Sequence, residues 1–160
     1  MDRRAALVGL VLASVMTMAA CSNDTPTKGT AQRDDVIAAA NAVCRQDLAN
    51  TKATLAAYKA RFPSGTPSAA DAKDFLVNTA TPAFESTVAG FHAIPIPEKD
   101  GQQFKDALAA IDKDLHDLKY QIDQDPVTVA VALSKVDPDK SGGATGALFV
   151  TFGAKDCSTL

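Results

Sequence analysis

The chain has 160 residues, 46% of them hydrophobic, and a formal net charge of −3 at pH 7. This mild negative charge argues against binding nucleic acid or an anionic membrane surface through bulk electrostatics. The length suits a single folded domain, and the absence of tryptophan removes the indole surfaces that sugar-binding sites usually present.

The first 20 residues have the three parts of a secretory signal. Arg3 and Arg4 give a basic start, residues 5–17 form an apolar stretch, and two alanines directly precede Cys21. The apolar stretch is shorter than the roughly 20 residues that a membrane-spanning helix needs. The Met-Ala-Ala-Cys sequence ending at Cys21 resembles the lipobox of bacterial lipoproteins, which implies that residues 1–20 are a signal peptide and that Cys21 is acylated. The double arginine leaves both the general secretory and the twin-arginine export routes open.

Residues 21–33 are expected to be the acylated cysteine and a flexible tether, because residues 22–33 are mostly small or polar. Such a tether reaches at most about 40 Å when fully extended. The sequence therefore predicts a folded domain at 34–160, held close to the extracytoplasmic side of the cell membrane by its lipid anchor.

Two further cysteines, Cys44 and Cys157, form an even pair. In an oxidising compartment this predicts one disulfide that joins the C-terminal segment to the first helix. The alternative is a reactive or metal-binding thiol pair, which the lack of a Cys-x-x-Cys spacing disfavours.

The first two helices are predicted from helical spacing of apolar residues. The first follows Asp34 or Asp35 as its N-terminal cap and ends before Pro63. The second begins at Ser68, and Pro82 is expected to break or kink it.

A proline-rich connector and a long third helix follow. Residues 93–97 are predicted to be extended, with both isoleucines packed, because each proline disfavours helix in the preceding residue. The third helix is predicted at 100–124, where apolar residues alternate in steps of four and three, as in the seam of a helical bundle. Its members are Phe104, Leu108, Ile111, Leu115, Leu118 and Ile122.

The last third of the sequence supports two interpretations. Asp125-Pro126 is typical of a helix start, but residues 127–133 alternate as in a strand, and residues 147–152 could form its partner. We favour two short helices, which gives an all-α compact bundle of four to five helices with one disulfide. The alternative is an α+β fold with a C-terminal hairpin at 127–133 and 147–152.

One motif suggests a metal site. Asp137, Asp139 and Ser141 occupy the first, third and fifth positions of an EF-hand-like loop whose turn glycine is Gly142. Position twelve is Leu148, where a bidentate glutamate is needed, so a polar turn is the favoured interpretation and calcium the weaker one.

Other chemistry finds little support in the sequence. His92 and His116 are expected to be exposed or capping residues, since no further ligand can be identified for either. Nucleophile-elbow, Walker, zinc-protease and dinucleotide signatures are absent from the sequence. We therefore expect no catalytic residues, no metal and no cofactor.

With the leader, Cys44 in the first helix, the Pro-x-Pro connector and the closing residues 153–157, the chain resembles the small helical secreted lipoproteins of actinobacteria. The resemblance carries over no functional residues. We expect a non-enzymatic, lipid-anchored binding or interaction module of the cell envelope, with an unknown envelope protein as its partner. The alternative is a carrier that holds a small apolar ligand in a cavity between helices.

Overall fold

The computed structural model describes residues 31–140 and 142–160, and within these ranges the regular structure is entirely helical. The predicted signal peptide, Cys21, the tether up to residue 30, and Ser141 lie outside the described residues. The elements are α1 (Arg33–Arg61), α2 (Ala69–Phe75), the π-helical turn η1 (Leu76–Ala80), α3 (Thr81–His92), α4 (Gly101–Gln124), α5 (Pro126–Ser134), α6 (Ala144–Phe152) and the 3₁₀ helix η2 (Lys155–Thr159).

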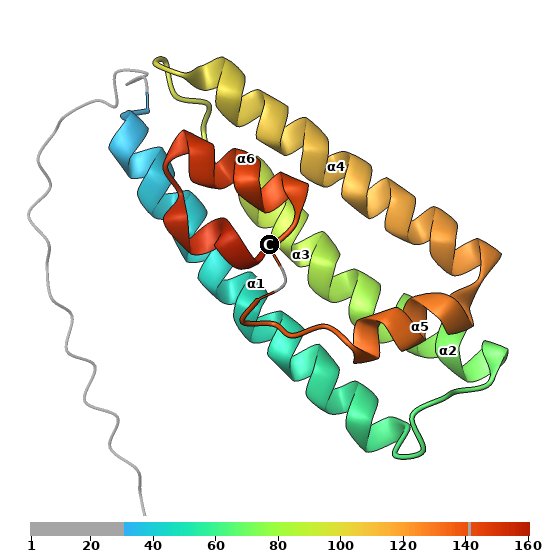
Figure 1. The fold of residues 1–160 in the computed structure, drawn as a ribbon. Helices are drawn as coiled ribbons and strands as arrows, with labels where there is room; N and C mark the ends of the chain where they lie inside the picture. The colour runs from blue at the N-terminus through green and yellow to red at the C-terminus, as the bar shows by residue number, and fades with distance from the viewer. Residues whose placement is uncertain (1–30, 141) are drawn as a thin grey trace, which may run out of the picture.

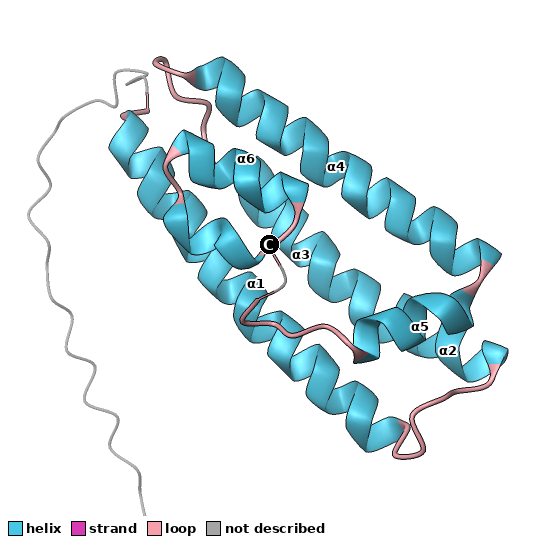
Figure 2. Ribbon diagram, viewed as in Figure 1, coloured by secondary structure: helices cyan, strands magenta, loops and turns pink. Residues whose placement is uncertain are grey.

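The helices form an all-α bundle, as the sequence predicts, and the hairpin alternative is wrong. Helix α1, the continuous rod α2–η1–α3, and α4 run alternately up and down beside one another (Figures 1 and 2). Helices α5 and α6 lie over these three rods at opposite ends, where the hairpin would have placed two strands. None of the helices in the described ranges has both the length and the apolarity needed to cross a membrane.

The interior of the bundle divides into two clusters of buried side chains. The first lies where α1, α3, α4, α6 and η2 meet, and its Phe91 and Phe149 rings stack with centroids 4.1 Å apart. The second lies where α1, α2, α4 and α5 meet, and its Tyr58 and Phe75 rings pack edge to face at 5.5 Å. Offset and edge-to-face pairs of this kind add to the stabilisation that burial gives.

Two of the predicted helix starts are confirmed by their capping hydrogen bonds. Ser68 Oγ accepts a hydrogen bond from the backbone N–H of Asp71 at 3.2 Å, and α2 begins at the next residue after Ser68. Asp125 Oδ1 accepts one from the N–H of Thr128 at 3.0 Å, and α5 follows with a proline in its first turn. Each cap satisfies an N–H group that has no partner within the helix.

The start of α1 differs from the prediction. The N-terminal cap is Gln32, which makes no side-chain capping bond, so the expected caps at Asp34 or Asp35 are wrong. Arg33 instead fixes this end, because its guanidinium donates to the Phe152 carbonyl and lies 2.9 Å from an Asp100 carboxylate oxygen. Residues 31–33, which the sequence analysis assigns to the tether, therefore belong to the folded part.

The connector between α3 and α4 buries only one of its two isoleucines. Ile94 is 7% exposed, whereas Ile96 is 39% exposed, so the prediction that both pack is wrong for Ile96. Ala31 pairs with Pro97 in an isolated parallel bridge, which joins the N-terminal end of the described chain to this connector.

Pro82 neither breaks nor sharply ends the helix that contains it. The backbone stays helical on both sides, and the π-turn η1 directly precedes α3. In this turn the N–H of Thr81 donates to the Leu76 carbonyl, five residues earlier. Proline has no N–H, and in a regular helix its ring clashes with the carbonyl four residues before it. The disruption is therefore accommodated by a widened turn within a continuous rod.

The predicted disulfide is present. Cys44 in α1 and Cys157 in η2 are bonded with their Cα atoms 5.0 Å apart and 113 residues apart in sequence. Both cysteines are buried in the first cluster. The N–H of Asp156 donates to Asn41 Oδ1 at 2.9 Å, so a hydrogen bond supports the same contact between η2 and α1.

The glycines before and within α6 allow the last residues of the chain to approach closely. The N–H of Gly143 donates to the Leu160 carbonyl at 2.7 Å. A Cβ atom at Gly146 would lie 2.5 Å from the Cys157 carbonyl oxygen, which is too close for any side chain. Glycine at this position lets α6 pack directly against η2.

We predict that removing the disulfide lowers the free energy of unfolding by about 3–5 kcal/mol. The reason is that the disulfide closes a long loop and thereby reduces the chain entropy of the unfolded state. The measurement is urea unfolding of the wild type and of the double variant Cys44→Ala/Cys157→Ala, each with and without dithiothreitol. Dithiothreitol should weaken the wild type and leave the double variant unchanged. An equal effect of the reductant on both proteins would contradict this prediction.

Candidate functional site

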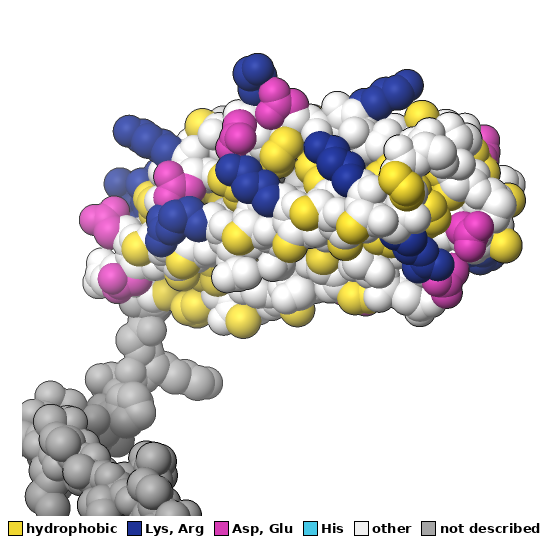
Figure 3. All heavy atoms as spheres, turned by 90° about the horizontal axis from the view of Figure 1, so that it is seen from below, with side chains coloured by type: hydrophobic (Ala, Val, Ile, Leu, Met, Phe, Trp, Pro, Cys, Tyr) yellow, Lys and Arg dark blue, Asp and Glu magenta, His cyan; other side chains and the backbone are white. Residues whose placement is uncertain are grey.

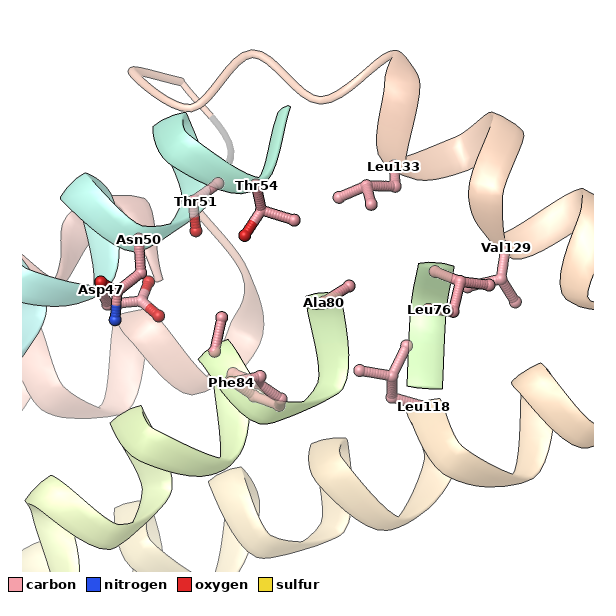
Figure 4. A pocket seen from close by; sticks show the side chains of 11 residues that line it. Asp47, Asn50, Thr51, Thr54, Leu76, Ala80, Phe84, Leu118, Val129 and Leu133 are labelled. Atoms are coloured by element: carbon pink, nitrogen blue, oxygen red, sulfur yellow. The ribbon is translucent and has the colours of Figure 1, made fainter. Parts of the chain in front are cut away.

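A pocket with a cavity volume of about 190 Å³ lies between the two buried clusters (Figure 4). It is bounded by the middle of α1, the π-turn and the start of α3, one residue of α4, and the inner side of α5. The lining residues are Asp47, Asn50, Thr51, Thr54, Leu76, Ala80, Ala83, Phe84, Leu118, Val129 and Leu133.

The pocket exists because neither cluster extends across the middle of the bundle. Helices α5 and α6 lie at opposite ends, and an irregular segment connects them across this region (Figure 1). On the side of the rod α2–η1–α3, Ala80 and Ala83 place only methyl groups toward the space; Ala80 ends the π-turn, and Ala83 directly follows Pro82. Single-turn π-bulges of this kind occur frequently at functional sites.

The two ends of the pocket differ in chemistry. Helix α1 contributes all of the polar lining side chains: Asp47, Asn50, Thr51 and Thr54. The opposite end is hydrocarbon from η1, α4 and α5, and in Figure 4 Leu76, Leu118, Val129 and Leu133 surround it. Apolar space with a few polar groups at one side is the usual composition of a small-molecule site.

Asp47 is the one charged residue that lines the pocket. Thr87 Oγ1 donates a hydrogen bond to Asp47 Oδ1 at 2.7 Å, and within the described residues this carboxylate has no ion-pair partner. Burial raises the pKa of Asp47 above its ordinary value of 3.8, and the bond from Thr87 offsets only part of this effect. A desolvated carboxylate beside a cavity is a candidate functional group.

The pocket continues toward a neighbouring hollow on the surface. This hollow has a volume of about 260 Å³, and Asp47, Thr51, Phe84 and Leu133 line both spaces. Its outer wall comes from the segment after α5 and from the last residues of the chain. The two spaces are therefore neighbours and share the wall that contains Asp47.

The two metal candidates that the structure describes, Asp137 and Asp139, do not belong to a cluster of metal-ligating side chains. Asp139 pairs with Lys52 at 2.7 Å, Asp137 pairs with Lys140 at 3.1 Å, and Ser141 lies outside the described residues. Asp137 Oδ1 also accepts the N–H of Asp139, which is the hydrogen bond of a polar turn. Across residues 31–140 and 142–160, no group of three His, Cys, Asp or Glu side chains converges.

The two histidines are exposed, and they lie apart from the pocket lining. His92 ends α3 and pairs through Nε2 with Asp112 of α4 at 2.7 Å.

Charged side chains of both signs lie beside one another on the face in Figure 3, with hydrophobic atoms in small scattered areas between them.

Asp47 and the pocket were not predicted from the sequence, although the sequence contains a signal for them. Steps of four and three along α1 pass through Ala40, Cys44, Asp47, Thr51, Thr54 and Tyr58, so three consecutive positions of an otherwise buried seam are polar. Polar residues at seam positions indicate either a hydrogen-bonded core or a lined cavity.

Comparisons with known proteins give no relative to guide the interpretation: no family model, no curated protein and no solved structure matches this chain.

We predict that Asp47→Asn makes the protein more stable at pH 7. Because the folded state raises the pKa of Asp47, the folded chain holds this proton to a higher pH than the unfolded chain does. The contribution of Asp47 is therefore most favourable below its unfolded pKa and declines as the pH rises through the folded pKa. Asparagine keeps an oxygen that can accept the Thr87 hydroxyl and carries no charge to desolvate.

The measurement is the urea midpoint of both proteins at pH 7 and at a pH below 3.8. The gain from Asp47→Asn should shrink at the lower pH. Asp35→Asn, which removes an exposed carboxylate from the same helix, is the matched control and should show no such gain. A lower midpoint for Asp47→Asn than for the wild type at pH 7 would contradict the assignment.

Proposed function

We propose that this chain is a membrane-anchored, non-enzymatic binding module of the cell envelope, and that it holds a small apolar ligand in the pocket between its two buried clusters. The observation that carries the proposal is this pocket, which has about 190 Å³ of space and is mostly hydrocarbon in its lining. Dry apolar cavities of about 150 Å³ are large enough to bind benzene. The available space therefore suits one aromatic ring with a short substituent.

The position of the pocket also supports binding. Its walls come from five elements, and hydrophobic side chains from four of them meet around the space. A ligand there would contact both buried clusters at once. It would supply packing contacts that the protein itself does not make at this place. Burial of apolar ligand surface would supply most of the binding free energy.

The anchoring part of the proposal rests on the lipobox-like sequence that ends at Cys21 and on the resemblance to small actinobacterial lipoproteins. A diacylglycerol on Cys21 would give stable attachment, because two acyl chains bind a bilayer far more firmly than one. The predicted location is the extracytoplasmic side of the cell membrane.

We predict that Cys21 carries the lipid. The full chain, expressed in a bacterium that is supplied with an alkyne-bearing fatty acid, should become labelled and should fractionate with membranes. Cys21→Ser should remove the label, whereas Cys44→Ser/Cys157→Ser should retain it, since its lipobox is intact. A label that persists in Cys21→Ser, or that never appears in the wild type, would refute the anchor.

We predict that the pocket binds indole, a neutral ring of suitable size. The experiment is an NMR titration of the full chain carrying Cys21→Ser, exported to a periplasm so that its disulfide forms. Amide shifts should change around Ala80, Leu118 and Val129. Ala80→Leu should weaken binding at least tenfold because the added carbons occupy the cavity, a loss equivalent to about 1.4 kcal/mol.

The matched control is Ala89→Leu, which adds the same atoms at an exposed position of the same rod. It should bind indole like the parent protein. Circular dichroism of Ala80→Leu separates a filled pocket from a misfolded protein. Saturable shifts that lie elsewhere, or none at millimolar indole, would refute the proposed function.

A protein partner is the second candidate function, and α6 is the observation that favours it. Leu148 and Val150 of α6 are 40% and 37% exposed. They lie in a stretch from residue 142 to 154 that has no charged residue. Depletion of charged residues, as in this stretch, is typical of the core of a surface that binds another protein.

A further inference from the structure

The two chemically different ends of the pocket define what kind of ligand fits it. The polar end lies on α1, and the hydrocarbon end lies against η1, α4 and α5. In Figure 4, Asp47 and Asn50 lie at one end of the pocket, and Leu118 and Val129 lie at the other. A ligand whose apolar body also carries a polar group would fill the hydrocarbon end and hydrogen-bond to the polar side chains of α1, which lose water on binding. An amphipathic ligand would satisfy both ends.

The charge at the polar end is negative and uncompensated. Asp47 is the charged member of the lining, and one of its oxygens already accepts the Thr87 hydroxyl. Its other oxygen can accept a further hydrogen bond. Elsewhere in the described chain, carboxylates near cations pair with them, as Asp139 does with Lys52 and Asp123 with Lys73. Within the described residues Asp47 has no such pair, so its carboxylate is available to a cation from outside the chain.

Phe84 strengthens the preference for a cation. It lines the pocket together with Asp47, and both residues also line the neighbouring surface hollow. The face of an aromatic ring attracts an ammonium group, and a carboxylate forms with it a charge-assisted hydrogen bond. Thr51 also lines both spaces and can accept a hydrogen bond through its hydroxyl. An anion at the same place would meet the carboxylate of Asp47 and be repelled.

We propose that the ligand of this pocket is a small organic cation: an ammonium group that pairs with Asp47, attached to an apolar body of about one aromatic ring that fills the space between the π-turn, α4 and α5. The inference rests on the proposed function, because it names the chemical class of ligand for the same pocket. It adds that Asp47 determines specificity, through recognition of positive charge.

The test compares three compounds that share a phenyl ring and a short chain and differ in charge: 2-phenylethylamine, 2-phenylethanol and 3-phenylpropionate. Each is titrated at pH 7 into the full chain carrying Cys21→Ser, and binding is followed by calorimetry and amide shifts. We expect the dissociation constant of the amine to be about tenfold lower than that of the alcohol, as a charge-assisted bond predicts. The carboxylate should bind most weakly.

Two variants locate the effect. Asp47→Asn should raise the dissociation constant of the amine to that of the alcohol and leave the alcohol nearly unchanged. Asp35→Asn removes the same charge from an exposed position on the same helix and should keep the preference for the amine. A retained preference in Asp47→Asn would overturn the role of Asp47.

The outcomes separate this inference from the proposed function. Equal affinities for the three compounds, with shifts around Ala80 that Ala80→Leu abolishes, would overturn the cation preference and leave the proposed apolar site standing. Tighter binding of the carboxylate would likewise overturn the inference alone. No binding of any of the three compounds, together with no binding of indole, would overturn both.

Discussion

The disulfide between Cys44 and Cys157 is the constraint on which the arrangement of the C-terminal half depends. It fixes η2 against the inner face of α1, and the close contact at Gly146 then places α6 over the first buried cluster. Helix α5, which directly follows α4, covers the second cluster. Neither short helix reaches the middle of the bundle, and the pocket begins at Asp47, one helical turn after the bonded cysteine. A covalent link that stabilises one end of the fold thus also sets the boundary of the cavity.

The polar stretch of the α1 seam departs from what stability alone would favour. Asp47 occupies a seam position where a hydrophobic side chain would be expected, and burial there raises the pKa of its carboxyl group. Thr51 and Thr54 continue the same face of α1. Apolar residues at these three positions could fill the space and join the two clusters into one core. Positions where a sequence gives up packing without an evident structural gain are often the positions that serve function. The polar seam of α1 therefore supports the proposed binding role of the pocket independently of the pocket's volume.

Local signals in the sequence predicted the helices. The features that depend on tertiary packing could not be predicted from the sequence. The caps at Ser68 and Asp125 were readable because each needs only residues within one turn. The start of α1 was not, because Arg33 is held by Phe152 and Asp100, which are distant in sequence. The strand-like alternation at 127–133 arises because α5 packs against α1, α2 and α4 together, so that hydrophobic residues are useful on several of its faces. The polar seam positions of α1 are a local signal, but the size and shape of the pocket depend on the spacing between helices, which no local pattern encodes.

Helix α5 borders the pocket and has few buried residues, and this connects ligand binding to stability. Within α5 only Ala130 is fully buried, while Val129 and Leu133, which line the pocket, are half-buried. An element with so few buried contacts opens at a lower free energy than the rods around it. A ligand that fills the pocket adds contacts to the side of α5 that lacks them, and it stabilises the folded state in proportion to its occupancy. A bound ligand would therefore hold α5 in place and join the two buried clusters.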